Sequence, residues 1–389
     1  MDEKSLAGLV KESEVVRICQ DLVRIKSLNP PGNERAAAEY VAAALKKKGV
    51  QAELVKHSET RASVLARLKG QGKAPALFYN GHLDTVPVGA EKWVHDPFSG
   101  EAAEGRVWGR GAADMKGGLA AMMAAVMALA EARIPLPGDL LLAATAGEEI
   151  DSLGAMEVAK KVSGEPIQAL FIAEPTYNEI YIAEKGVLWV EVETFGKTAH
   201  GSMPEKGQNA VTMMVEVIKE LEKLDIPYKT HPILGGFTRS INTISGGVKT
   251  NVVPDHCVAT VDMRTVPGQE HSAILRQVET VIQGLSRKVA DFKAMVKAIN
   301  DHPAVETSPA EPVLQRFAAI VGGMTGQKAV FKGANYFSDV VGFLPVLKAP
   351  LILFGPGEPG LAHQPNENVE ISKLVEAARI YAVTAARLL

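Results

Sequence analysis

Two adjacent glutamates follow an apolar run in the segment LLLAATAGEE, and acidic or imidazole side chains follow three other apolar runs. His82 and Asp84 follow ALFYN, Glu174 follows ALFIA, and His363 lies beyond LILF. Asp114 stands in the loop RGAADMKGG, before an Ala-rich segment. Imidazole and carboxylate suit zinc, cobalt or manganese, and a carboxylate can also move protons in a reaction. These residue types therefore indicate a metal-dependent catalytic site.

Each of these residues, taken alone, has an ordinary structural explanation. A histidine after a strand is usually a satisfied polar residue, and the pair Glu148–Glu149 fits a charged helix start. Asp114 could cap the helix that follows it. The combination is different, because four apolar runs and one loop deliver only His, Asp and Glu. Ligands bind beyond the carboxyl ends of parallel strands, so these side chains are expected at one edge of a sheet.

The number of candidate ligands favours two metal ions over one. Five strong ligands crowd a tetrahedral site, whereas a carboxylate that bridges ions about 3.5–4 Å apart shares them. Glu148 is then a surplus carboxylate beside a ligand, available as a general base. His82 and Asp84 lie two residues apart in extended chain and point to the same side. The Asp84 carboxylate is therefore expected to accept a hydrogen bond from His82 and fix its tautomer.

The elements that must position these residues alternate in the first two-fifths of the chain. Asn33 is expected to cap a helix over 34–49, and a second helix is expected over 117–132. Continuous apolar runs between the helices predict strands over 63–68, 76–80, 140–145 and 169–173. Such runs are typical of a mostly parallel sheet that helices flank on both faces. The fold class is therefore α/β.

The pattern changes near residue 185. GVLWVEVETFG (186–196) alternates strictly, as in a half-exposed antiparallel strand. It is followed by an expected helix, two strands, a helix and a strand, at 209–224, 240–247, 257–264, 270–289 and 294–300. This order is the α+β ferredoxin-like plan. The α/β pattern then returns, with helices expected near 311–323 and from 371. We expect a catalytic domain of residues 1–185 and 302–389, interrupted by a second domain of residues 186–301.

Composition excludes several classes of protein. The chain has 389 residues, of which 47% are hydrophobic and 22% charged, with a net charge of −3. This balance argues against nucleic-acid and membrane partners. The two cysteines, Cys19 and Cys257, form no CxxC spacing, which argues against a disulfide framework or a thiolate cluster. The N-terminus is charged and the apolar stretch 117–130 is too short for a span. A soluble cytoplasmic protein is expected.

Five motifs resemble those of one enzyme family. They are GHLDTVP (81–87), GRGAADMKGG (109–118), AGEEIDSLGA (146–155), AEPT (173–176) and AHQPNENV (362–369). They resemble the acetylornithine deacetylase / succinyl-diaminopimelate desuccinylase / aminoacylase / carboxypeptidase G family of co-catalytic metallohydrolases. The resemblance runs from residue 27 to the C-terminus, with the motifs in the family's order. It implies a zinc-peptidase-like catalytic domain and an inserted domain that serves as lid and dimerisation domain.

The resemblance also implies two divalent metal ions per subunit. His82 and Glu174 would hold one ion, Glu149 and His363 would hold the other, and Asp114 would bridge them. Zinc is the expected metal, with cobalt or manganese as alternatives. A homodimer through the lid domain is implied as well.

Other residues receive roles by the same resemblance. Asp84 would orient His82, and Glu148 would be the catalytic base. His200, in GKTAHGSMPEKGQNA, would reach the partner subunit's site as an oxyanion donor. Asn251 and Arg264 would contact the carboxylate of the substrate. Structural alternatives stay open for the lid residues, because His200 could fix a turn and Arg264 could pair with a surface acid.

The predicted reaction is hydrolysis of an amide next to a free carboxylate, in an N-acyl amino acid or a dipeptide-like compound. The segment KGANYFSDVVG (332–342) lacks the Thr-Ser-Asp-Gly-Arg sequence of the true desuccinylase, so no particular substrate is predicted. Asp339 in this segment could help to shape the pocket. Alternatives are a metallo-dipeptidase, a carboxypeptidase or an aminopeptidase acting on small peptides, and a catalytically silent metal-stabilised binding protein. The loop before residue 117 does not spell GxGxxG, which argues against nucleotide binding.

Overall fold

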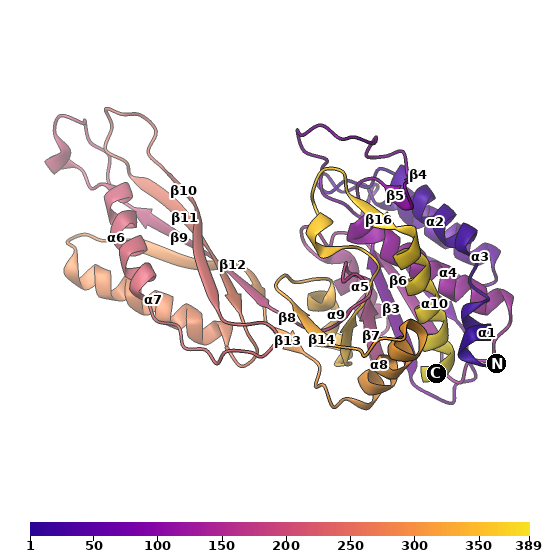
Figure 1. Cartoon of the computed structure of the whole chain (residues 1–389). Helices are drawn as coiled ribbons and strands as arrows, with labels where there is room; N and C mark the ends of the chain where they lie inside the picture. The colour runs from indigo at the N-terminus through magenta and orange to yellow at the C-terminus, as the bar shows by residue number, and fades with distance from the viewer. The chain divides into compact units, whose positions relative to one another are not determined.

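The computed structural model describes residues 1–389, which form two compact units. The first unit contains residues 1–182, 307–332 and 338–389, and the second contains residues 183–306 and 333–337. The inserted unit was expected at 186–301. It begins at Ala183, ends at Glu306 and includes a short later segment that the sequence pattern did not assign to it. Figure 1 shows the elements of both units.

The large sheet has nine strands, in the order β1-β2-β6-β3-β7-β15-β8-β13, with β14 paired to β8. Most of it belongs to the first unit, whereas β13 and the ends of β8 and β14 belong to the second. Its four central strands, β6, β3, β7 and β15, are mutually parallel, whereas β1, β2 and β8 pair antiparallel. The prediction of a largely parallel sheet is confirmed for this centre. The strands are β1 (Gln51–Lys56), β2 (Ala62–Leu68), β3 (Ala76–His82), β6 (Leu140–Thr145), β7 (Ile167–Ile172), β8 (Ile180–Glu184), β13 (Val305–Glu306), β14 (Phe331–Ala334) and β15 (Leu351–Leu353).

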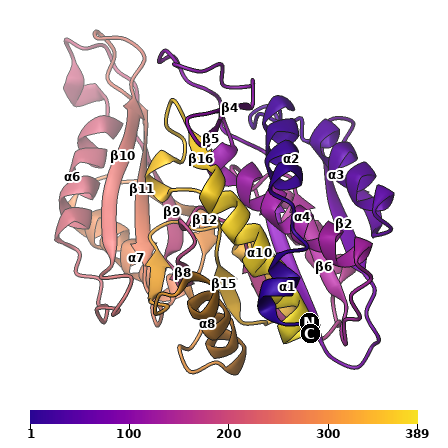
Figure 2. The ribbon, with the colours of Figure 1, turned by 45° about the vertical axis from the view of Figure 1, so that its right-hand side comes forward.

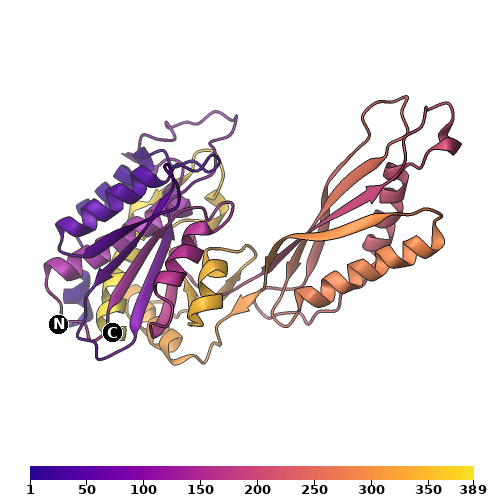
Figure 3. The same cartoon turned by 180° about the vertical axis from the view of Figure 1, so that it is seen from behind.

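Helices cover both faces of this sheet. Helix α10 packs against α4 and α8 and α4 packs against α2, while α5 packs against α9 on the opposite face (Figures 1 and 3). Every residue of β3 and β6 is buried as a result, which explains their continuous apolar runs. The helices of the unit are α1 (Glu3–Ala7), α2 (Glu12–Arg24), α3 (Arg35–Lys47), α4 (Gly117–Glu131), α5 (Leu153–Lys161), α8 (Pro312–Thr325), α9 (Val340–Leu347) and α10 (Ile371–Leu388).

The Ala-rich helix α4 is the central core helix of this unit. The stretch Ala112–Glu131 is long and apolar enough to cross a membrane, but 94% of its apolar 18-residue segment is buried inside the structure. Its glycines allow close packing, because a Cβ on Gly118 would lie 2.2 Å from the carbonyl oxygen of Ala173. The start of α4 therefore packs tightly against the end of β7. The two chain termini also lie side by side, and Arg387 donates to the carbonyl oxygen of Met1 at 2.9 Å (Figure 2).

The second unit has the predicted ferredoxin-like plan. Its strands β9 (Gly186–Phe195), β10 (Thr238–Gly246), β11 (His256–Thr265) and β12 (Ala294–His302) form an antiparallel sheet in the order β10-β11-β9-β12. Helices α6 (Ala210–Lys223) and α7 (His271–Lys288) bury one face of the sheet in a core of their own. In β9, Leu188, Val190 and Val192 are buried and alternate with partly exposed residues, as the sequence pattern predicts.

One local prediction is wrong, and one element was not foreseen. Asn33 does not cap α3, which begins after Glu34 and has no side-chain cap. Glu34 is instead fully buried and pairs with Arg61 at 3.3 Å, so a tertiary contact takes the place of a local one. The unforeseen element is a small antiparallel sheet with no signal in the sequence pattern. It joins β4 (Glu101–Ala103) and β5 (Arg106–Trp108) to β16 (Asn368–Glu370), far along the chain.

Candidate metal site

Three neighbouring parallel strands end at the same edge of the large sheet. His82 is the last residue of β3, Glu148 and Glu149 follow the end of β6, and Glu174 follows the end of β7. His363 comes after β15 and the short helical turn η3 (Pro359–Leu361). The sequence prediction that these side chains gather at one edge therefore agrees with the structure.

Asp114 lies between two imidazoles. Its Oδ1 is 3.1 Å from Nε2 of His82, and its Oδ2 is 3.4 Å from Nε2 of His363. Asp114 does not cap helix α4, because it belongs to a short irregular turn, η1 (Ala112–Lys116), in which its own φ and ψ are not helical. One carboxylate oxygen faces each histidine, as the prediction of a bridging carboxylate expects.

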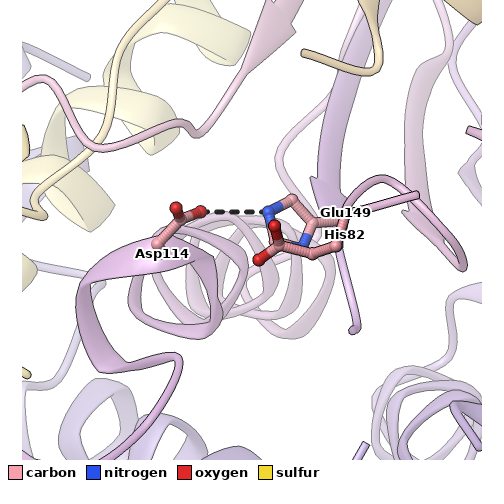
Figure 4. Close-up of side chains that lie close together, drawn as sticks. All are labelled: His82, Asp114 and Glu149. Carbon is pink, nitrogen blue, oxygen red and sulfur yellow. Dashed lines mark hydrogen bonds and ion pairs between the residues drawn. The ribbon is translucent and has the colours of Figure 1, made fainter. Parts of the chain in front are cut away.

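Glu149 completes the cluster. Its Oε2 lies 3.0 Å from Nε2 of His363. Ligand atoms of His82, Asp114 and Glu149 all lie within 4.8 Å of one another, and Figure 4 shows the three side chains turned together. These nitrogen and oxygen donors fit a divalent ion such as zinc, cobalt or manganese.

The electrostatics of the cluster also favour bound cations. Burial raises the pKa of Glu148 well above its usual range, and the carboxylates of Glu174 and Glu149 raise it further. Burial alone would lower the pKa of His82, but Asp114 and the neighbouring glutamates outweigh it and raise that pKa well above its usual value. Several carboxylates therefore crowd a site where His82 is 0% exposed and Glu148 is 8% exposed. Divalent ions would relieve this repulsion.

The sequence suggested that the carboxylate of Asp84 orients His82, but the structure shows a different contact. Nδ1 of His82 lies 3.0 Å from the main-chain oxygen of Asp84, whereas the carboxylate is 3.7 Å away. A hydrogen bond from Nδ1 to this carbonyl leaves Nε2 free to face Asp114. The tautomer of His82 is thus fixed by the backbone of Asp84.

The Asp84 carboxylate holds the turn that carries the paired glutamates. Its Oδ1 accepts hydrogen bonds from the backbone N–H groups of Gly147 and Glu148, at 3.0 and 3.2 Å, and its Oδ2 accepts from Glu149 at 3.2 Å. Asn29 also donates to Oδ2 at 2.9 Å. The glutamates therefore stand in a turn before α5 and are not a helix start.

Arg61, which sequence reasoning missed, supports the same turn from the other side. It donates two hydrogen bonds to Asp151, at 3.0 and 3.2 Å. Gly147 has φ +90, and a Cβ there would lie 2.3 Å from both Arg61 Nη2 and Asp151 Oδ1. A glycine between an apolar run and two acids was the only local sign of this tight packing.

Comparison with known proteins gives the family. The model of peptidase family M20/M25/M40 matches residues 78–387 of the chain. The chain belongs to this family. The M20 chain is 30% identical over 388 residues to the probable succinyl-diaminopimelate desuccinylase of Staphylococcus aureus, an alignment that covers 92% of this chain and 93% of that one. It is 28% identical over 415 residues to the N-formyl-4-amino-5-aminomethyl-2-methylpyrimidine deformylase of Bacillus subtilis, covering 98% and 96% of the two chains.

A solved structure supports the fold. The M20 family metallo-carboxypeptidase Sso-CP2 from Sulfolobus solfataricus matches with a TM-score of 0.79 and 20% identity, covering 96% of this chain and 98% of that one. Family membership and the His-Asp-Glu cluster together establish that this M20 chain is a metal-dependent hydrolase acting on amide bonds. The catalytically silent alternative is therefore wrong.

Three predicted residues of the M20 chain lie in the second unit. His200 is exposed, and its Nδ1 lies 2.7 Å from Oγ of Ser202. Asn251 is its neighbour, since its carbonyl oxygen accepts from the N–H of Gly201 at 2.8 Å. Arg264 donates two hydrogen bonds to Asp262, at 2.9 and 3.0 Å. The roles predicted for His200, Asn251 and Arg264 stay predictions.

Asp339 does not line a pocket. It stands at the start of α9 in the first unit, is 0% exposed, and accepts a hydrogen bond from the hydroxyl of Thr145. Because Thr145 is the last residue of β6, this buried carboxyl group supports the strand that leads to the glutamates.

Proposed function

We propose that this M20 chain removes the acyl group from an N-acyl amino acid, by hydrolysis of the amide next to a free carboxylate. The observation that carries the proposal is Asp114, with one carboxylate oxygen turned to each of two imidazoles. Two relatives support the reaction, because their names, a desuccinylase and a deformylase, both denote removal of an acyl group.

In the proposed site, His82 and Glu174 would hold one divalent ion, Glu149 and His363 would hold the other, and Asp114 would be shared between them. Zinc is the proposed metal, with cobalt or manganese as alternatives. When bound, such ions lower the pKa of a water molecule and polarise the carbonyl of the substrate.

Glu148 is the proposed general base. Its Oε2 lies 3.9 Å from Nε2 of His82, and the backbone hydrogen bond to Asp84 fixes its position beside Glu149. The carboxylate takes a proton from the attacking water and then gives it to the amine that leaves, so that acid and amine products form without net proton transfer by the protein.

The second unit is proposed to bind the substrate carboxylate. Arg264 already holds a carboxylate, that of Asp262, with two nitrogen atoms, so its geometry suits a substrate carboxylate in the same way. Asn251 is proposed to assist it, and His200 to stabilise the oxyanion. We also propose a homodimer through this unit and a cytoplasmic location. Both cysteines are free, which fits a reducing compartment.

One substrate panel tests the proposed reaction. Protein loaded with zinc should hydrolyse N-acetyl, N-succinyl or N-formyl amino acids and should leave a free dipeptide of matched sequence largely intact. A metallo-dipeptidase or aminopeptidase gives the opposite order, because it requires the free amine. Fewer than about two ions per chain in every active preparation would contradict the bridged site.

The Glu148→Ala variant tests the base. It should lower kcat by about 10²- to 10⁴-fold while both ions remain bound, because only the proton transfer is lost. Steady-state kinetics with metal analysis measure both quantities. The control is Glu157→Ala, since Glu157 lies on the surface of α5 and pairs only with Lys160. Near wild-type turnover in a metal-loaded Glu148→Ala variant would sink this mechanism.

A further inference from the structure

The ion pair between Arg110 and Glu367 is buried next to the metal site and has no part in the proposed chemistry. Arg110 is 2% exposed and Glu367 is 0% exposed, and Nη1 lies 2.6 Å from Oε2. Burying two charges is costly even when they attract each other. A pair in this position calls for an explanation beyond fold stability.

Glu367 fixes the backbone that carries Asp114. Its Oε1 accepts hydrogen bonds from the N–H groups of Ala113 and Asp114, both at 2.9 Å. Its main-chain oxygen also accepts from the N–H of Gly109 at 2.9 Å, which extends the pairing of β5 with β16. The irregular turn η1 is therefore attached to the segment that follows His363.

Arg110 fixes the backbone that carries His363. Its Nη2 donates to the main-chain oxygen of His363 at 3.2 Å, and its Nη1 donates to that of Gln364 at 3.3 Å. The ring of Trp93 lies over the guanidinium, with 5.1 Å to the ring centroid. The donors of one arginine thus hold a loop in which His363 itself has the unusual φ of 63.

We propose that Arg110 and Glu367 are positioning residues for the metal site, which set the distance between Asp114 and His363. Neither of these two ligands stands in a regular strand or helix, and their nearest side-chain atoms lie 3.4 Å apart. The ion on the His363 side loses the alignment of two of its three ligands when the pair is broken, whereas the other ion loses one. This inference rests on the proposed two-ion site.

The test is a metal titration of chelator-treated protein with Co²⁺ alone, followed by visible absorption and calorimetry. His363→Ala removes one ligand and so identifies the signal of that ion. In Glu367→Gln, affinity for the same ion should fall about 10- to 100-fold, the usual effect of losing a partner of a metal ligand. Affinity for the other ion should change by about threefold or less.

A matched control separates positioning from general stability. Asp139 accepts from Arg67 at 2.6 Å and from the N–H of Gly70 at 2.8 Å, which resembles the bonding of Glu367. Asp139→Asn should lower the melting temperature but leave both Co²⁺ affinities unchanged. Arg110→Lys keeps the positive charge but cannot donate from two guanidinium nitrogens. It should show the same selective loss of Co²⁺ affinity as Glu367→Gln. It decides the question if Glu367→Gln does not fold.

If Glu367→Gln binds both Co²⁺ ions as tightly as wild type, or binds both of them equally more weakly, this proposal is wrong while the proposed function stands. A wild-type chain that never binds two ions would overturn the proposed function together with it. Selective loss of the His363-side ion, with the Asp139→Asn control unaffected, supports the positioning role.

Discussion

Asp339 is a carboxyl group without solvent contact beneath the site. Burial raises its pKa from 3.8 to about 6, although the hydrogen bond from Thr145 and the nearby His82 act in the opposite direction. Nδ2 of Asn80 lies 3.5 Å from Oδ2 of Asp339, and Oδ1 of Asp339 has no hydrogen-bond partner. The folded protein therefore keeps the proton on this side chain to a higher pH than the unfolded chain does.

The pH dependence of stability tests this conclusion in metal-free protein. Between about pH 4 and pH 6, the folded state keeps a proton on Asp339 that the unfolded chain has released, so this group makes stability fall as pH rises. Asp339→Asn removes that loss, and its free energy of unfolding relative to wild type should rise by about 2 kcal/mol from pH 4 to pH 7. Urea unfolding at several pH values measures the difference.

Asp139→Asn is the control of opposite sign. Arg67 and the N–H of Gly70 outweigh burial and lower the pKa of Asp139, so its contribution to stability is lost as pH falls. Its variant should therefore lose stability relative to wild type as pH rises. If the difference in unfolding free energy between Asp339→Asn and wild type is the same at every pH, the interpretation of Asp339 is wrong.

At the scale of elements, the turn between β6 and α5 carries the proposed base Glu148 and the proposed metal ligand Glu149. Asp84 holds its backbone from one side, and the Arg61–Asp151 pair packs against Gly147 from the other. The paired glutamates therefore keep their directions without help from a helix. The same turn presents Glu149 to His363 and Glu148 toward His82.

Gly147→Ala tests the tightness of this turn. The new Cβ would push Arg61 and Asp151 apart and would also require an alanine at φ +90. The free energy of unfolding should fall by more than about 2 kcal/mol, and kcat should fall because Glu148 moves.

Gly164→Ala is the matched control, with φ +83 and nothing within 4 Å of the added atom. It should cost about 1 kcal/mol, the backbone strain alone, and leave kcat unchanged. Equal losses in the two variants, measured by urea unfolding and kinetics, would show that the packing around Gly147 does not matter.

At the scale of the whole molecule, each unit has its own core, and the sheet of the second unit has unpaired edge strands. The strand β10 is at one edge of its sheet and β12 is at the other. Ile244 on β10 is 54% exposed, and an apolar edge strand is a template for pairing with another chain. This edge supports the proposed homodimer.

Sedimentation velocity tests the dimer. Wild type should sediment as a dimer at micromolar concentration, and Ile244→Lys should shift it toward monomer, because a charge on the pairing edge opposes association. Ile299→Lys on β12 is the control, since Ile299 is 42% exposed at the opposite edge. The dimer should survive that change. A wild-type monomer, or equal effects of both lysines, would contradict pairing through β10.

The sequence by itself determined the central strands, the ferredoxin-like insert and the chemical types that meet at one sheet edge. Burial of both sheet faces requires continuous apolar runs, and parallel strands place their ends together. Local patterns were therefore sufficient to predict that His82, Glu149 and Glu174 lie at the same edge of the sheet. The resemblance to a known family added the predicted bridging role of Asp114 and the predicted roles of the second unit.

The tertiary structure alone decided how those residues are held. The Asp84 carboxylate accepts hydrogen bonds from the backbone of the turn that carries the glutamates. Arg110 forms an ion pair with Glu367, which is far away in the sequence. Such bonds depend on the positions of backbone N–H and C=O groups from segments far apart in sequence, and no spacing of residue types records them. The same reason explains why Glu34 turned to Arg61 and left α3 without the expected Asn33 cap.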